Sequence, residues 1–428
     1  MTDFPIPDLS AWLDYQQRTH PDAIALGLDR VRETWRRMGA PAPAPVVVTV
    51  GGTNGKGSTV AFLESIYAAA GKRVGAYTSP HLLRYNERAR IDGVDVDDAG
   101  WIDAFERIES ARGEIELTYF EFGTLAALWR FAQARLDVAI LEVGLGGRLD
   151  AVNLIDADAA IVTTIDLDHQ DWLGNDRDSI GREKAGIFRG GRPAIVGEPD
   201  PPDGLLDAAR AIGADLVCAG RDYTWQRVGE RWRWQCGASA LDLPLPALAA
   251  PVQLANAAAA IAAVHALRDR CGWDAAAIAA GVVRARVSAR LQRIANAPDV
   301  FVDVAHNPQA ARALAQWLAA TPLHGRTLAV FGALGDKDVA GVVAALDACI
   351  DLWFPAALDA DSPRGLSAQA LVERMAMLPR ERIAPVSANV RDALAAARAQ
   401  ARADDRIVVF GSFFVAAAGL AGAGRDRG

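Results

Sequence analysis

A glycine-rich loop between an apolar segment and a helical pattern constrains this chain more than any other feature. Residues 46–59 read Val-Val-Val-Thr-Val-Gly-Gly-Thr-Asn-Gly-Lys-Gly-Ser-Thr. An amphipathic pattern follows, with apolar residues on one side at Val60, Leu63, Ile66, Tyr67 and Ala70. The backbone N–H groups of such a loop, the helix N-terminus and Lys56 all attract an anion. The segment therefore predicts strand, phosphate loop and helix, with a nucleotide triphosphate as the ligand.

The loop departs from the standard Walker sequence in two places. That sequence has glycine six residues before the lysine, where this chain has Val50. It has Ser or Thr directly after the lysine, where this chain has Gly57, with Ser58 one step later. The alternative is a glycine-rich turn that binds nothing, but the lysine, the serine and three glycines at one point favour phosphate binding. The departures bear on the class of ATPase.

Length and charge restrict the remaining possibilities. A chain of 428 residues exceeds one ordinary hydrophobic core, so two or three domains are expected. The net charge of −8 disfavours nonspecific binding to nucleic acid. The start, Met1-Thr-Asp-Phe-Pro, resembles no signal peptide, and no apolar run reaches membrane-spanning length. We therefore expect a cytoplasmic enzyme that binds neither nucleic acid nor membrane.

The cysteines predict no metal site and no disulfide framework. The four are scattered and form no Cys-x-x-Cys pair, at Cys218, Cys236, Cys271 and Cys349.

Short apolar runs alternate with helical patterns, which indicates an α/β fold. Runs typical of buried parallel strands occupy 73–77, 137–143, 159–164 and 194–196, and 122–134 is a helical stretch between two of them. Residues 221–245 read as a short β-rich excursion and 256–270 as a helix.

A second α/β series begins near residue 298. Strands are expected at 300–304, 327–331, 351–354 and 407–410, and Asn307 with Pro308 reads as a helix cap followed by the first helical residue. The prediction is a phosphate-loop ATPase domain with a mostly parallel sheet over residues 1–295. A smaller C-terminal Rossmann-like α/β domain is expected over residues 296–428.

Four further clusters follow predicted strands, where ligand residues gather in an open α/β sheet. Ser79 could offer a hydroxyl to a metal, although its Ser-Pro context alone favours a plain turn. Glu142 ends an apolar run, so Mg²⁺ at the phosphates is favoured as its partner over a solvated loop position. His169 is by itself more often structural than a ligand. Lys184 precedes apolar residues that would make it nucleophilic, but alone it is more often an exposed helical lysine.

Taken together, the motifs resemble a known family. They are Gly-Thr-Asn-Gly-Lys-Gly-Ser, Ser-Pro-His-Leu, Tyr-Phe-Glu-Phe-Gly-Thr, Glu-Val-Gly-Leu-Gly-Gly-Arg-Leu-Asp-Ala, Leu-Asp-His, Glu-Lys-Ala-Gly-Ile, Asp-Val-Ala-His-Asn-Pro and Gly-Ser-Phe. This set is similar to the bifunctional dihydrofolate synthase/folylpolyglutamate synthase family of the Mur ligase superfamily. The motifs occur in family order from about residue 12 to residue 415, nearly the whole chain.

The resemblance implies an ATP site with magnesium. Its ATP-binding residues would be Thr53, Asn54, Gly55, Lys56, Gly57, Ser58, Asn256, Arg290 and Asp303. Ser79 and Glu142 would hold one Mg²⁺, and His169 and Lys184 would lie at a second. Lys184 would be carbamylated by CO₂, and Lys56, Lys184 and His169 would be catalytic. General phosphate-loop logic would instead make Ser58 the metal ligand. Asp303 and His306 belong to the second domain, so the resemblance places ATP between the domains.

The resemblance also implies a dihydropteroate site. Its residues would be Arg18, Thr19, His20, Pro21, Thr118, Tyr119, Phe120, Glu121, Leu149, Asp150 and Ala151. Alone, Tyr119 and Phe120 are more often core aromatics, whereas the Glu121 carboxylate can pair with pterin donor nitrogens. The chain departs from the family at 288–290, where Ser-Ala-Arg replaces Pro-Gly-Arg and the backbone freedom of glycine is lost before Arg290.

The activity implied is an ATP-dependent carbon–nitrogen ligase acting as a monomer. It would join L-glutamate to 7,8-dihydropteroate and to the γ-carboxylate of reduced folates through an acyl phosphate. A monofunctional folylpolyglutamate synthase is the nearest alternative, against which the Tyr-Phe-Glu segment argues. A muramyl-peptide synthetase is disfavoured because no extra N-terminal nucleotide-sugar domain is apparent and Gly57 follows the lysine. A nucleotide switch or transport ATPase would need switch loops that the sequence does not suggest.

Overall fold

The computed structural model describes residues 6–20 and 24–425. Contacts divide the chain into two compact units. The first comprises the chain up to Ala247 together with Leu254–Arg286, and the second comprises Leu248–Gln253 and Val287 onward. The sequence placed the domain boundary at 295/296. In the structure, strand β12 (Gln292–Ala295) pairs with β13 (Asp299–Val302), so the segment before that boundary belongs to the second sheet.

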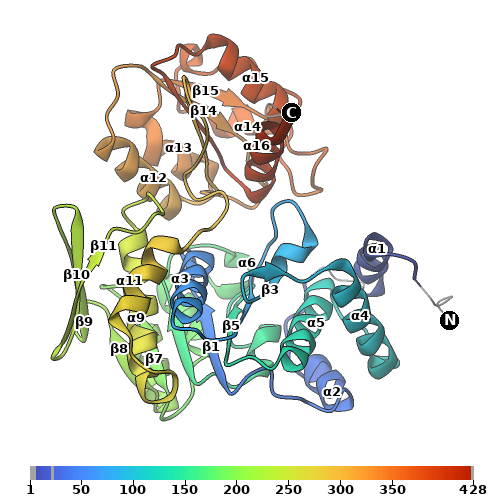
Figure 1. Ribbon diagram of the computed structural model, residues 1–428. Helices are drawn as coiled ribbons and strands as arrows, with labels where there is room; N and C mark the ends of the chain where they lie inside the picture. The colour runs from blue at the N-terminus through green and yellow to red at the C-terminus, as the bar shows by residue number, and fades with distance from the viewer. Residues whose placement is uncertain (1–5, 21–23, 426–428) are drawn as a thin grey trace. The chain divides into compact units, whose positions relative to one another are not determined.

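The first unit contains an eight-stranded sheet in the order β4-β3-β2-β5-β1-β6-β7-β8 (Figure 1). The strands are β1 Val46–Gly51, β2 Val74–Tyr77, β3 Ala89–Ile91, β4 Val94–Asp95, β5 Val138–Glu142, β6 Ala159–Val162, β7 Pro193–Val196 and β8 Asp215–Cys218. Strands β2, β5, β1, β6, β7 and β8 run parallel, and β3 and β4 add an antiparallel hairpin at one edge. The predicted mostly parallel α/β sheet is confirmed, and β3, β4 and β8 are additions to it.

Helices cover the sheet on both faces, as buried parallel strands require. They are α1 Leu9–Thr19, α2 Asp29–Arg37, α3 Lys56–Ala69, α4 Asp98–Arg112, α5 Tyr119–Ala134, α6 Gln170–Leu173, α7 Arg177–Ala185, α8 Asp203–Ile212, α9 Gln253–Ala266, α10 Arg268–Cys271 and α11 Ala275–Arg284. Two 3₁₀ helices, η1 (Tyr85–Arg88) and η2 (Ala151–Leu154), lie in loops after strands. Helix α3 packs against β1, β2, β5 and α11, whereas α5 packs against β2 and α4.

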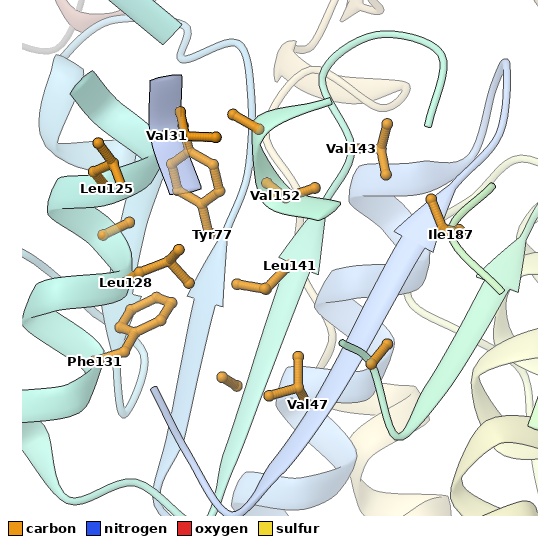
Figure 2. Packing of buried hydrophobic residues seen from close by; sticks show 14 of the residues in the cluster. Val31, Val47, Tyr77, Leu125, Leu128, Phe131, Leu141, Val143, Val152 and Ile187 are labelled. Atoms are coloured by element: carbon orange, nitrogen blue, oxygen red, sulfur yellow. The ribbon is translucent and has the colours of Figure 1, made fainter. Parts of the chain in front are cut away.

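The packing between α5 and the sheet holds the strand ends in place. Leu125, Leu128 and Phe131 project from α5 toward Tyr77 of β2 and Leu141 of β5 (Figure 2). All five side chains are buried. Burial of each such side chain contributes about 1.5–3 kcal/mol to folding. This packing holds the ends of β2 and β5 in place, and with them the first residues of the loops that follow.

The β-rich excursion predicted over 221–245 is confirmed as a separate antiparallel sheet. Its strands are β9 Tyr223–Val228, β10 Arg231–Cys236 and β11 Ser239–Pro244, in the order β11-β10-β9. Trp232 and Trp234 alternate with exposed residues along β10 and are fully buried. One face of this sheet is therefore covered, which is the pattern of an antiparallel sheet.

The second unit has its own sheet, in the order β12-β13-β16-β14-β15, with β14 Thr327–Phe331, β15 Leu352–Pro355 and β16 Arg406–Phe410. All neighbours are parallel except β12 with β13, so the predicted smaller α/β sheet is confirmed. Its helices are α12 Pro308–Ala320, α13 Val339–Leu346, η3 Asp347–Cys349, α14 Ala368–Arg374, η4 Arg380–Arg382, α15 Val390–Gln400 and α16 Phe413–Arg425. Asn307 caps α12 by accepting from the N–H of Ala310, as predicted. Within the described residues, no helix has both the length and the apolarity needed to cross a membrane.

Candidate nucleotide and ligase site

The loop between β1 and α3 fits only glycine at two positions. Gly52 has φ 139° and Gly55, which precedes α3, has φ 88°, conformations that other residues rarely adopt. A Cβ added at Gly52 would lie 1.9 Å from Thr163 Oγ1, and one at Gly55 would lie 2.4 Å from Asn256 Oδ1. Asn256, which was predicted far along the chain as an ATP-binding residue, therefore lies directly against the loop.

Two threonines at the end of β6 hold this loop. Thr163 Oγ1 donates to Asn54 O at 2.6 Å, and Thr164 Oγ1 accepts from the Asn54 N–H at 3.1 Å. The Thr53 N–H donates to Thr164 O at 2.7 Å. Neither threonine was predicted as a site residue, because their role depends on the pairing of β6 with β1.

Two lysines predicted to be catalytic meet at one backbone carbonyl. Lys56 Nζ donates to Gly52 O at 3.0 Å and to Thr53 O at 3.2 Å. Lys184 Nζ, from the end of α7, donates to the same Gly52 O at 3.1 Å. The structure therefore brings residues 132 positions apart to one point of the phosphate loop.

Lys184 is only 4% exposed, which contradicts the surface lysine that its neighbours alone favoured. Burial, and after it the positive charge of Lys56, lower the pKa of Lys184 to about 7, against the opposing effect of Asp168, Asp150 and Glu183. Near neutral pH a large fraction of this side chain is therefore an uncharged amine.

The predicted metal ligands Ser79 and Glu142 are adjacent. Glu142 ends β5, lies in register with Val50 of β1 and is 5% exposed. Its Oε2 accepts from the Ser79 N–H at 3.3 Å. Ser58 lies in the first turn of α3 with Gly57, and its Oγ is buried without a hydrogen-bond partner among the described residues.

Hydroxyl and carboxylate oxygens are of the type that suits Mg²⁺, which prefers hard oxygen ligands and shares its coordination with phosphates. Within the described ranges no group of three or more His, Cys, Asp or Glu side chains is placed to hold a metal by itself. A site here therefore depends on hydroxyl and phosphate oxygens. His169 stands at the start of α6 with φ 52°, and its N–H donates to Asp168 Oδ1 at 2.9 Å.

The segment predicted to bind pterin begins α5. Thr118 and Glu121 form a capping box at the start of the helix, in which Glu121 Oε2 accepts from the Thr118 N–H at 2.8 Å. Glu121 is 3% exposed and also pairs with Arg30, Nη2 to Oε1 at 2.9 Å. Tyr119 and Phe120 are half-buried. The Phe120 ring occupies the space where a Cβ of Gly144 would be, 2.6 Å from Cζ.

Asp150 is buried within the neighbouring loop. Its carboxylate accepts from the N–H groups of Leu145 at 2.8 Å and Val152 at 3.0 Å. Burial raises the pKa of Asp150 to about 6, although these N–H groups and Lys56 favour the ionised form. Leu149 O accepts from the Gly27 N–H, and Ala151 is buried at the start of η2.

The N-terminal part of the predicted pterin site is described only in part. Arg18 and Thr19 end α1, and His20 follows. Pro21 lies outside the described residues.

In the second unit, Asp303 is buried and follows β13. Its carboxylate accepts from the N–H groups of Leu291 and Ala305, both at 2.8 Å. Burial raises the pKa of Asp303 and the nearby Arg290 lowers it, with a net rise. The Arg290 guanidinium lies 5.8 Å from the Phe413 ring centroid, and His306 Nδ1 lies 2.8 Å from Val304 O.

The backbone before Arg290 keeps the conformation that a glycine would favour. Ala289, where the family has glycine, adopts φ 54°. For a residue with a Cβ this left-handed conformation costs about 1–2 kcal/mol. Ala289 therefore keeps the left-handed turn before Arg290, at the cost of backbone strain.

A buried arginine that was not predicted as a site residue lies beside the Tyr119 segment of the first unit. Arg88, at the end of η1, is 7% exposed, and its Nε donates to His81 Nδ1 at 2.9 Å. Burial, together with the charge of Arg88, lowers the pKa of His81 to about 4, although Glu87 acts in the opposite direction. The guanidinium lies 5.2 Å from the ring centroid of Tyr85 and 5.4 Å from that of Tyr119. No sequence pattern predicted this, because Tyr-Asn-Glu-Arg reads as an ordinary polar loop.

Comparisons with known proteins agree with this arrangement. The Mur ligase middle domain matches residues 50–264, and the Mur ligase glutamate ligase domain matches residues 289–413. The chain is 48% identical over 410 residues to the dihydrofolate synthase/folylpolyglutamate synthase of Escherichia coli (strain K12), covering 96% of this chain and 94% of that protein.

Solved structures give the same result. E. coli FolC in complex with DHPP and ADP has a TM-score of 0.93 to this chain at 46% identity, with 99% of both chains covered. A bifunctional folylpolyglutamate synthase/dihydrofolate synthase with Mn, AMPPNP and L-glutamate bound has a TM-score of 0.89 at 47% identity, covering 97% of this chain and 98% of that one.

Proposed function

Because the chain belongs to the dihydrofolate synthase/folylpolyglutamate synthase family of Mur ligases, we propose that it joins L-glutamate to 7,8-dihydropteroate and to the γ-carboxylate of reduced folates, using ATP. The observation that carries the chemistry is the meeting of Lys56 and Lys184 at Gly52 O in the phosphate loop. Lys56 supplies a positive charge for the phosphates. Lys184 is a buried amine that contacts the same loop carbonyl and therefore lies close to the reacting phosphate.

The reaction needs ATP because an amide does not form readily from a carboxylate and an amine in water. In the first step an oxygen of the dihydropteroate carboxylate attacks the γ-phosphorus, and ADP leaves. Lys56 and the N–H groups of the loop hold the phosphate oxygens as charge moves toward ADP. In the second step the amino group of glutamate attacks the acyl carbon. Inorganic phosphate leaves with the bridging oxygen, and the nitrogen loses a proton.

Ser79 and Glu142 are the residues we assign to the first divalent cation, with Ser58 as the alternative hydroxyl. Such a cation, when bound, neutralises charge on the phosphates. The support is the contact between Ser79 N–H and Glu142 Oε2 and, in the first turn of α3, a buried Ser58 Oγ that has no partner among the described residues. His169 and Lys184 remain our assignment for a second cation.

Lys184 is proposed to carry a carbamate. An uncharged amine adds to CO₂ and releases a proton, which converts a cation into an anionic oxygen ligand. The 4% exposure of Lys184 and its pKa of about 7 support this, since burial disfavours the protonated form that cannot react. The charge of Lys56 acts in the same direction.

The remaining site residues keep the roles implied by resemblance as proposals. Asn256 is supported for ATP by its place against Gly55. Arg290 and Asp303 are assigned to the nucleotide from the second unit. The pterin assignments at 18–21, 118–121 and 149–151 rest on the resemblance. Tyr119 and Phe120 are half-buried and pack against Tyr85 and Tyr77. A cytoplasmic location and a monomeric state stay predictions.

A product assay tests the proposed function and its nearest alternative. Purified protein is incubated with ATP, Mg²⁺ and glutamate, and with either dihydropteroate or tetrahydrofolate, and products are identified by mass. We expect dihydrofolate from the first acceptor and a diglutamate from the second. Activity on tetrahydrofolate alone would leave a monofunctional folylpolyglutamate synthase. Release of phosphate that depends on neither acceptor would favour a nucleotide switch or transport ATPase.

A further inference from the structure

Arg88 is a buried cation that the protein itself does not neutralise. It is 7% exposed, and among the described residues no Asp or Glu forms an ion pair with it. Arg90, two positions later, is also largely covered but is paired with Glu64, Nη2 to Oε2 at 2.8 Å. Because an unpaired buried charge is costly, such a group is usually matched by an anion.

The partners of Arg88 carry no negative charge. Nε donates to His81 Nδ1 at 2.9 Å, the rings of Tyr85 and Tyr119 lie within 5.4 Å of the guanidinium carbon, and the Tyr77 hydroxyl is a further neighbour. Among the described residues, no carboxylate accepts a hydrogen bond from either Nη nitrogen of Arg88. These two nitrogens form the fork that binds a carboxylate by two parallel hydrogen bonds.

Arg88 lies between the two segments that an acceptor must reach. On one side, the Arg88 side chain contacts His81, which follows Ser79 in the loop after β2. On the other side is Tyr119, in the segment assigned to the pterin. A molecule whose ring lies at the Tyr119 segment and whose acid group reaches the phosphate side therefore passes the guanidinium.

Resting on the proposed function, we propose that Arg88 binds the carboxylate of dihydropteroate and holds it for attack on the γ-phosphate. His81 positions the guanidinium through Nε, and the two tyrosine rings pack against it and fix its orientation. Arginine suits this place because it stays charged at every physiological pH and presents two donors in one plane.

The test measures the preference of the protein for a charged acceptor. Equilibrium binding of dihydropteroate and of its carboxamide is compared in the wild-type protein, in Arg88→Gln and in Arg88→Lys. A charge-assisted pair predicts that the wild-type protein binds the acid about 10- to 100-fold more tightly than the carboxamide. Arg88→Gln should reduce this ratio to within about 3-fold, and Arg88→Lys should retain part of it.

Arg406→Gln serves as the matched control. Arg406 is also 7% exposed and lies over an aromatic ring, 4.8 Å from the Trp317 centroid, but it begins β16 in the second unit. Its replacement should leave the acid-to-carboxamide ratio unchanged. The wild-type comparison needs no variant, so a folding defect in Arg88→Gln does not remove the test.

The outcomes separate this inference from the function on which it rests. Equal affinity of the wild-type protein for acid and carboxamide, or an unchanged ratio in a folded Arg88→Gln, would overturn the role of Arg88 and leave the ligase intact. Failure of the wild-type protein to bind either compound would contradict the proposed function, and this inference with it. A steady-state readout adds to this, since Arg88→Gln should raise KM for dihydropteroate while KM for ATP stays within about 3-fold.

Discussion

Lys184→Met should lower the rate of amide synthesis about 10³-fold while leaving the affinity for ATP within about 3-fold of the wild-type value. Methionine has a similar length and suits a site that is 4% exposed, so the packing is retained while the reactive nitrogen is lost. Nucleotide affinity persists because Lys56 and the loop N–H groups are untouched. Steady-state kinetics and binding of a non-hydrolysable ATP analogue measure the two effects, and full activity in this variant would remove Lys184 from the mechanism.

The proposed carbamate on Lys184 should give a ¹³C resonance of its own, and that resonance should depend on pH. With ¹³C-labelled bicarbonate, the wild-type protein should give a carbamate carbon resonance that Lys184→Met lacks and Lys72→Met keeps. Below its pKa of about 7 the amine is protonated and cannot add to CO₂. The resonance should therefore weaken as the pH falls from about 8.5 to about 6. A signal that is unaffected by loss of Lys184 would show that the carbamate lies elsewhere.

Gly52→Ala should destabilise the protein by about 3 kcal/mol or more and weaken ATP binding at least 10-fold. The new Cβ would lie 1.9 Å from Thr163 Oγ1, which is itself held by Asn54 O, and the backbone there has φ 139°. The loop must move, and with it the carbonyl that both Lys56 and Lys184 contact. Denaturant unfolding and nucleotide titration measure the two effects.

Gly71→Ala is the control that separates strain from collision. Gly71 has φ 74°, but a Cβ there meets nothing within 4 Å. Gly71→Ala should be destabilised only by backbone strain, which lowers the free energy of unfolding by about 1 kcal/mol, and it should keep its affinity for ATP. Equal costs for Gly52→Ala and Gly71→Ala would mean that the loop adapts freely, against the fixed cradle described here.

The strand pattern and the phosphate loop were predictable from sequence because both depend on local chemistry. Apolar runs indicated β1, β5 and β6. An N-cap asparagine followed by proline indicated the start of α12. The β12 strand was not predictable, because Gln-Arg-Ile-Ala at 292–295 has no continuous apolar run and forms a strand by pairing with β13. The predicted boundary therefore lay beyond it.

The site residues were likewise predictable only where their role depends on the local sequence. Lys56 was evident within its own motif, whereas the burial of Lys184 required knowing that α7 returns to Gly52. Thr163 and Thr164 were read only as the end of a strand, because their role depends on β6 lying next to β1. Arg88 gave no signal, since its significance is that no carboxylate of the described residues forms an ion pair with it. Resemblance supplied several assignments that residues alone could not.

Transfer of oxygen is the measurement that tests the central claim most directly. Dihydropteroate labelled with ¹⁸O in its carboxylate is turned over with ATP and glutamate, and the released phosphate is analysed by mass. An acyl-phosphate route predicts that each phosphate carries one oxygen from the acid, because that oxygen attacked the γ-phosphorus and left with it. Phosphate free of ¹⁸O, formed together with dihydrofolate, would contradict the account.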